Sequence, residues 1–300
     1  MLGAFPFHQE EYPAFIDRIK AYIIKSIREA KVHTAWLRPD TNYENAFTEF
    51  VDKVLEDSGE NPFLKAFRPF QRKIQHYGIF NSLSQTLLKL TAPGVPDTYQ
   101  GTELWDLSLV DPDNRRPVDF ALRQSLLKSL IRQDQANAAK LMADLCANPE
   151  DGRIKLFLTY KALQARQHYP DLFQRGDYQK LPVLGSLQDH VVAFARHWND
   201  KIAIVIVPRL LTHLVPEGDY PLGEKVWQET RISLPLSAAT TWQNLITGQS
   251  VSGEDTLWIR EVLTQFPVAL LLGDWGSPDR NESVRSLSES TANEPTEEIE

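Results

Sequence analysis

Five charged side chains lie within nine residues in the stretch DPDNRRPVD, at positions 111–119. Carboxylates and guanidiniums at this density offer paired hydrogen bonds to adjacent hydroxyls of a ligand. The same groups can instead pair with one another and stiffen a long loop, and a binding loop needs both kinds of contact. The candidate binding residues here are Asp111, Asp113, Asn114, Arg115 and Arg116.

Two shorter groups of polar residues could join this loop. Gln100 and Glu103 lie where VPDTYQG should end, a partly β-branched run at 95–101 that is bounded by turn residues and predicts one buried strand. They could bind ligand hydroxyls, or they could cap that strand and brace its loop. Lys31, His33 and Trp36 supply a donor, an imidazole and a flat ring, although a lone His is more often a structural hydrogen-bonding residue.

Other kinds of chemistry have no support in the sequence. The histidines have no paired metal-ligand spacing and Cys146 is the only cysteine, so we predict no metal. There is no Gly-rich phosphate loop and no GxSxG motif, so we predict no nucleotide cofactor and no serine nucleophile. We expect no cofactor of any kind.

The elements that must position these residues are helical in the first half of the chain. From Pro13, the apolar residues Phe15, Ile19, Tyr22 and Ile23 recur at helical spacing. A second helix should begin behind a Thr41 or Asn42 cap. Further helices are expected at 61–78, 79–94, 119–133, 135–148 and 151–169.

The second half has the pattern of an antiparallel β-sandwich. Short strand-like runs alternate with turns, and we expect strands at 190–198, 201–210, 231–236, 240–248, 256–263 and 266–273. The domains predicted are 1–175, 176–276 and a disordered acidic tail at 277–300. A single strand among the helices of the first domain is unusual, because a parallel strand needs neighbours for its backbone groups.

Charge and hydropathy exclude several classes of partner. Of the formal charge of −8, the last 22 residues carry seven acids and two arginines, so the body is close to neutral. It has no dense basic stripe, which argues against nucleic acid and anionic membrane surfaces. With one cysteine, no signal-like start and no membrane-length apolar run, we expect a cytoplasmic protein that binds a neutral or small ligand.

The stretch PGVPDTYQGTELWDLSLVDPDNRRPVDF at 93–120 resembles the last strand and following loop of the α-amylase superfamily barrel, in the form found in maltooligosyltrehalose synthases. The resemblance extends to LGAFP at 2–6, REAKVHTAW at 28–36, FNSLSQ at 80–85 and LLKLTAPG at 87–94. These motifs together cover residues 1 to about 125, and they occur in the same order as in the family. The C-terminal half agrees in type but has no diagnostic motif.

The resemblance implies a (1→4)-α-D-glucan 1-α-D-glucosylmutase, an isomerase of trehalose biosynthesis. Such an enzyme converts the reducing-end α-1,4 bond of a maltooligosaccharide into an α,α-1,1 bond, using two carboxylates in the manner of a retaining glycosidase. The loop at 111–116 would then form a polar wall where the released glucose is held. Water must stay out while that glucose turns.

The chain departs from the family pattern because it is expected to lack the barrel strands that carry the catalytic carboxylates. The nucleophile, the acid/base and a third carboxylate stand at the ends of barrel strands four, five and seven. This chain is expected to begin after strand seven, so we assign it no catalytic residue and expect it to be inactive alone. The fold class implied is the C-terminal part of a (β/α)8 barrel, mostly helices and the last strand, followed by an antiparallel β-sandwich. Its partners would be a maltooligosaccharide and the N-terminal remainder of the barrel.

Two other functions remain open. The chain could be a non-catalytic glycan-binding or scaffolding module, or part of a related α-amylase-family hydrolase. Trp198, Trp227, Trp242 and Trp258 could form a glycan platform, but aromatic residues at strand spacing are more often core.

Overall fold

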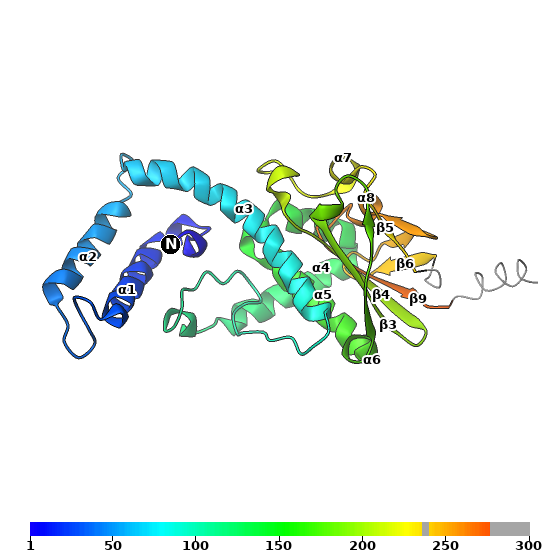
Figure 1. Ribbon diagram of the computed structural model, residues 1–300, viewed down its shortest axis with the longest axis horizontal. Coiled ribbons are helices and arrows are strands. Elements are labelled where there is room, and N and C mark those ends of the chain that lie inside the picture. Colours follow the sequence, from blue (N-terminus) through cyan, green and yellow to red (C-terminus); the bar gives the residue numbers. More distant parts are fainter. Residues whose placement is uncertain (236–239, 277–300) are drawn as a thin grey trace, which may run out of the picture. The chain divides into compact units, whose positions relative to one another are not determined.

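The computed structural model describes residues 1–235 and 240–276 and divides into two compact units (Figure 1). The first unit is made of residues 1–79, 98–126 and 150–152, and the second holds the other described residues. This division differs from a single boundary near residue 175, because segments before that residue, such as 80–97 and 127–149, belong to the same unit as the strands. The predicted acidic tail at 277–300 lies outside the described residues.

The helices occupy most of the chain before residue 175 (Figure 1). The α-helices are α1 (Tyr12–Ala30), α2 (Thr41–Val54), α3 (Pro62–Thr91), α4 (Phe120–Ala147), α5 (Arg153–His168), α6 (Pro170–Gln174), α7 (Gly223–Trp227) and α8 (Ile259–Val262). Short 3-10 turns are η1 (Leu2–Ala4), η2 (Gln9–Glu11), η3 (Asp113–Arg115), η4 (Pro149–Asp151), η5 (Gln188–His190) and η6 (Leu211–His213).

Helices α1 and α2 confirm the periodicity read from the sequence. Phe15 and Ile19 are buried in a small core that α1 shares with Val51 of α2. The cap of α2 was predicted one or two residues too late. Asp40 is the N-cap, and its carboxylate accepts hydrogen bonds from the Asn42 and Tyr43 amides at 3.1 Å.

Helix α3 is continuous where two helices were predicted. It runs for 30 residues through Gly78, the expected stop, and contains Pro69 in its interior. Its buried residues Phe80, Leu83 and Leu87 recur at helical spacing beyond Gly78, and their burial favours continuation. By contrast, α4 breaks near the predicted junction, because Asn137 is non-helical and its side chain accepts a hydrogen bond from the Lys140 amide at 3.0 Å.

The strand predicted at 95–101 is absent. Every residue between α3 and β1 is described, and none of them forms a strand. Val95 is 97% exposed and Tyr99 is 45% exposed, so the segment is not buried either. The physical reason is that this chain offers the segment no neighbouring strand with which its backbone groups could pair.

The strands confirm the antiparallel prediction. The bounds are β1 (Asp177–Lys180), β2 (Val183–Leu184), β3 (Val191–Trp198), β4 (Lys201–Pro208), β5 (Arg231–Ser233), β6 (Thr241–Asn244), β7 (Ser250–Ser252), β8 (Thr256–Trp258) and β9 (Ala269–Asp274). They form a six-stranded sheet in the order β1-β3-β4-β9-β6-β7 and a three-stranded sheet in the order β2-β5-β8. Strands β1, β2 and β7 were not predicted, and 259–262 in a predicted strand is helix α8.

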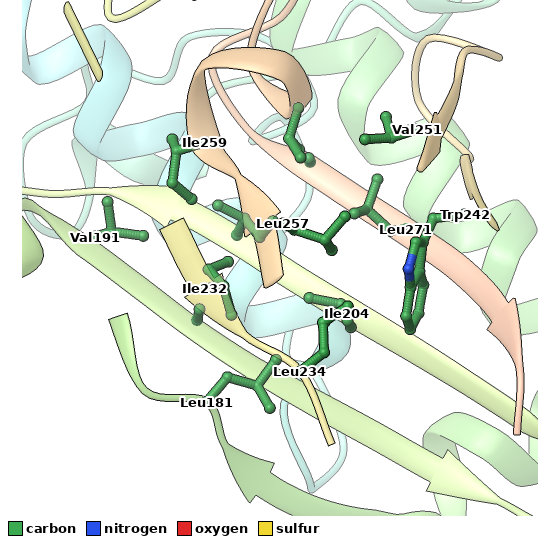
Figure 2. Packing of buried hydrophobic residues seen from close by; sticks show 14 of the residues in the cluster. Leu181, Val191, Ile204, Ile232, Leu234, Trp242, Val251, Leu257, Ile259 and Leu271 are labelled. Carbon is green, nitrogen blue, oxygen red and sulfur yellow. The ribbon is translucent and has the colours of Figure 1, made fainter. Parts of the chain in front are cut away.

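The two sheets share one core (Figure 2). Ile232 and Leu257 of the small sheet pack with Ile204 and Leu271 of the large sheet, and all four are fully buried. Alternate residues of β4, such as Val205, face the other side of the large sheet and are buried as well, and α6 contacts β3 and β4. The large sheet is therefore covered on both faces.

The core also contains two of the four tryptophans weighed as a glycan platform. Trp227 and Trp242 are 0% exposed, which confirms the core interpretation for them. Trp258 is half-buried, and the guanidiniums of Arg231 and Arg260 lie 5.2 and 4.7 Å from its ring centroid. Trp198 is also half-buried.

Candidate functional site

Asp113 is the centre of the charged loop. Its carboxylate accepts hydrogen bonds from Arg18 Nε at 3.0 Å and Nη2 at 2.9 Å, and from the Leu109 amide at 2.6 Å. Arg116 Nε adds an ion pair at 3.1 Å. Burial acts to raise the pKa of Asp113, but the hydrogen bonds from Arg18 and Leu109 outweigh it and hold the pKa below its usual range.

The neighbouring residues of the loop are more exposed. Asp111 and Arg115 form an ion pair four residues apart, with side chains 46% and 70% exposed. Arg116 Nη2 donates to Ser108 Oγ at 3.2 Å. The Oδ1 atom of Asn114 is buried and has no hydrogen-bond partner in the structure. The loop is therefore rigid around Asp113 and has polar atoms that a ligand could still use.

The segment that carries Trp36 is fixed by a buried glutamate. Glu44 of α2 accepts hydrogen bonds from Arg28 at 2.8 and 2.6 Å and from Thr34 Oγ1 at 2.6 Å. The bonds from Arg28 and then Thr34 lower the pKa of Glu44 to about 2. The Arg28 guanidinium also lies 5.0 Å from the centroid of the Trp36 ring, which is 55% exposed.

A turn at 99–103 holds Gln100 and Glu103. Glu103 Oε2 accepts hydrogen bonds from the Gly101 amide and from Arg123 Nε, both at 3.0 Å. Arg123 Nη2 also donates to the Gly101 carbonyl at 2.8 Å. Gly101 has φ +94°, a conformation that glycine adopts without strain. Glu103 therefore braces its loop, as one of its two interpretations expected.

Two hollows lie beside the loop, and both belong to the first unit. One, which we call the acidic cleft, has a volume of about 750 Å³. Its polar and aromatic lining includes Phe7, His8, Glu10, Glu11, Arg18, Gln100, Trp105, Asn114, Arg116, Glu150 and Asp151. The centroids of the Phe7 and Trp105 rings are 6.1 Å apart, and both side chains are half-buried.

The other hollow, which we call the Trp36 cavity, has a volume of about 820 Å³ and a more apolar lining. Its lining residues are Asp17, Arg18, Ala21, Tyr22, Ile24, Lys25, Arg28, Glu29, Trp36, Val110, Asp111, Pro112 and Asp113. An aromatic ring beside carboxylates and guanidiniums suits a sugar, whose C–H face stacks while its hydroxyls form paired hydrogen bonds. Both hollows are in the size range of small-molecule sites.

The structure brings together six of the ten predicted residues. Trp36, Asp111 and Asp113 line the Trp36 cavity, although Trp36 is far from the loop in sequence. The acidic cleft is lined by Gln100, Asn114 and Arg116. The other four, Lys31, His33, Glu103 and Arg115, line neither hollow.

The contacts of the outlying residues do not indicate a binding site. Lys31 ends α1 in a left-handed conformation at φ 58°, and it is exposed. His33 packs against Tyr43 in a tilted arrangement, with ring centroids 4.8 Å apart. Asp119 in the same charged run accepts from the Leu122 amide at 2.8 Å and caps α4.

Arg18 and Trp105 are the two residues that the sequence did not reveal. Arg18 lines both hollows and binds Asp113, which is 95 residues away in the chain. Its helical position gives no signal that distinguishes it from a surface arginine. Trp105 was within the motif that carried the family resemblance, and its place beside Glu103 was the available signal.

No cluster of three or more His, Cys, Asp and Glu side chains within residues 1–235 and 240–276 could hold a metal ion. No helix in the described part of the chain is long and apolar enough to cross a membrane. Cys146 is a free cysteine whose pKa is raised to about 11 by burial, so its thiolate is disfavoured at neutral pH.

Comparison with known proteins gives a consistent result. A Mycobacterium tuberculosis protein that bears the name maltooligosyl trehalose synthase is 34% identical over 274 residues, which is 91% of this chain and 30% of the relative. The chain is homologous to maltooligosyltrehalose synthase. The structure of maltooligosyltrehalose synthase from Arthrobacter ramosus matches with a TM-score of 0.69 and 31% identity, over 91% of this chain and 31% of that chain.

A second solved structure, named as a hypothetical maltooligosyl trehalose synthase of Sulfolobus tokodaii, matches with a TM-score of 0.58 and 29% identity. The match covers 90% of this chain and 30% of the Sulfolobus tokodaii chain. No protein-family model matches. The chain thus spans about 30% of the length of the synthases that it matches, and it corresponds to a C-terminal-like part of them.

Proposed function

We propose that this chain is the C-terminal part of an enzyme that converts the reducing-end α-1,4 bond of a maltooligosaccharide into an α,α-1,1 bond. The observation that carries the proposal is the homology to maltooligosyltrehalose synthase over 91% of the chain. The absence of a membrane-spanning helix among the described residues and the single cysteine agree with a cytoplasmic enzyme of trehalose biosynthesis.

The part of the reaction that we assign to this chain is sugar binding. The exposed Trp36 ring would stack on one face of a glucosyl unit, and Asp111, which lines the same cavity, would bind its hydroxyls. The acidic cleft would provide further contacts through Gln100, Asn114 and Arg116. A preformed wall of this kind orients the sugar and excludes water while the new bond forms.

We assign the nucleophile and the acid/base to the remainder of the enzyme. The two well-buried carboxylates of the site region, Asp113 and Glu44, are each bound by an arginine that lowers their pKa. A general acid needs a raised pKa, and a nucleophile needs lone pairs that face the substrate. Both carboxylates instead accept hydrogen bonds within the chain, which supports placing the nucleophile and the acid/base elsewhere in the enzyme. We expect the chain alone to be inactive.

Exposed apolar side chains support a protein partner for the first unit. Leu37 is 101% exposed, Val32 75%, Phe50 62% and Phe70 54%. Large apolar side chains that are left exposed are candidates for burial against a partner. We assign this surface to the N-terminal remainder of the barrel.

A non-catalytic glycan-binding module is the second candidate function. It is favoured by one observation, the presence of two hollows with aromatic and polar linings beside carboxylates that are not free for catalysis. Under this alternative the chain binds maltooligosaccharide by itself and contributes nothing to bond rearrangement.

A segment exchange tests the proposal. In the Arthrobacter ramosus enzyme, the matched part is replaced by this chain, and maltopentaose is followed by loss of reducing ends and by product analysis. We expect the hybrid to form trehalose-ended chains and the isolated chain to leave the reducing ends intact. Free glucose or maltose as the main product would favour a hydrolase. A folded but inactive hybrid, with maltopentaose binding to the chain in calorimetry, would favour the binding module.

A further inference from the structure

Helix α1 holds the charged loop at two places. Arg18 Nη2 donates to the Leu107 carbonyl while the same guanidinium binds Asp113, and Lys25 Nζ donates to the Asp111 carbonyl. Arg18 and Lys25 are seven residues apart, so they lie on one face of the helix, two turns from each other. One rigid helix therefore fixes the loop at Leu107, Asp111 and Asp113.

The contact at Arg18 is well sheltered and specific. The side chains of Arg18 and Asp113 are only 16% and 12% exposed. Both Nε and Nη2 bind the carboxylate, at 3.0 and 2.9 Å, which is a bidentate arrangement. A lysine has no fork of this kind, so it could keep the charge but could not keep both the carboxylate and the Leu107 carbonyl in place.

Asp113 passes this constraint to the rest of the loop. It also accepts from the Leu109 amide at 2.6 Å and pairs with Arg116, so the backbone at 109 and the side chain at 116 depend on it. Its immediate neighbours in sequence include Asp111, which lines the Trp36 cavity, and Asn114, which lines the acidic cleft. Arg18 itself lines both hollows.

We infer that Arg18 is a positioning residue for the sugar, acting through Asp113 to set how the loop at 107–116 presents its polar atoms to both hollows. This inference rests on the proposed function. Arg18 does not need to touch the sugar, because its guanidinium already donates to the Asp113 carboxylate and the Leu107 carbonyl. Its loss would let the loop shift, and a small shift of a positioning element weakens binding strongly.

The test uses the hybrid enzyme described above, with Arg18→Lys and Arg18→Met. The matched control is Lys20→Met, which removes a cation from the same helix whose partner, Asp52, is on α2 and not on the loop. We expect both Arg18 variants to raise KM for maltopentaose by about tenfold or more, with kcat changed less. Circular dichroism and Tm should stay close to those of the unsubstituted hybrid, and the control should leave KM unchanged.

A double-variant cycle separates positioning from a general structural effect. Asp113→Asn should raise KM like Arg18→Met, and the two together should add little, because they break one linkage. An unchanged KM in the Arg18 variants would overturn the inference, including the case in which only Tm falls. If Arg18→Met does not fold, the same criteria apply to Arg18→Lys. Failure of the proposed function would appear differently, as an unsubstituted hybrid that forms no trehalose-ended product.

Discussion

The β region, which we define as the two sheets at residues 177–274, and the first unit are stabilised in different ways. In the β region, Trp227, Trp242, Ile204 and Leu271 are completely buried, and two sheets close a core within this chain. Among the described residues of the first unit, the core around Phe15 is small, and the loop is ordered by hydrogen-bonded ion pairs. The two sheets thus bury a core between themselves, whereas the first unit is suited to a larger assembly.

The apolar surface of the two regions supports the same conclusion. Leu37, Phe50 and Phe70 of the first unit are more than half exposed, whereas the apolar residues of β4 are buried on both faces of the sheet. Burial of apolar area is the main favourable term in folding. A unit that leaves so much of it exposed has stability to gain from a partner.

The largest expected effect is in the β core. Trp242→Ala removes a fully buried ring, and we expect the free energy of unfolding to fall by about 3–5 kcal/mol. Urea denaturation followed by far-UV circular dichroism measures it. The control is Leu37→Ala at a fully exposed position, which should change the free energy by less than about 0.5 kcal/mol. Equal losses in the two variants would contradict the difference between the buried Trp242 and the exposed Leu37.

An intermediate effect should appear on acidification. The folded-state pKa of Glu44 is about 2, below its usual value of 4.5, so ionised Glu44 stabilises the fold above about pH 4.5. That contribution is lost as the pH falls from about 4.5 through 2. Glu44→Gln should therefore lower Tm at pH 7, and the difference from the unsubstituted chain should shrink at low pH. A difference in Tm that is constant from pH 7 to pH 2.5 would refute the role of the Glu44 charge.

The smallest effect on stability is expected on the outer face of α3. Phe70→Ser removes a 54% exposed ring and should change the free energy of unfolding by less than about 0.5 kcal/mol, while reducing self-association in light scattering. Phe80→Ser on the same helix is the matched control. Because Phe80 is 2% exposed, this substitution should lower the free energy of unfolding strongly. In the hybrid enzyme, Phe70→Ser should destabilise more than in the isolated chain. The same small effect in both would argue against a covered face.

The sequence determined the features that depend on local pattern. Helical spacing predicted α1, because an amphipathic period marks a buried face wherever the chain folds, and short strand-like runs between turns predicted β3 and β4. The motif at 93–120 was enough to indicate the relatives that the comparisons found. It also marked the loop whose residues line both hollows.

Tertiary structure alone decided which partners those residues take. Asp113 binds Arg18 across 95 residues, and Trp36 and Asp111 line one cavity, and neither arrangement has a local signal in the sequence. The run at 95–101 has the composition of a strand but no neighbour to pair with, so it is an exposed segment. A strand and an ion pair each need a second segment of chain, and where that segment lies is set by the packing of the whole fold.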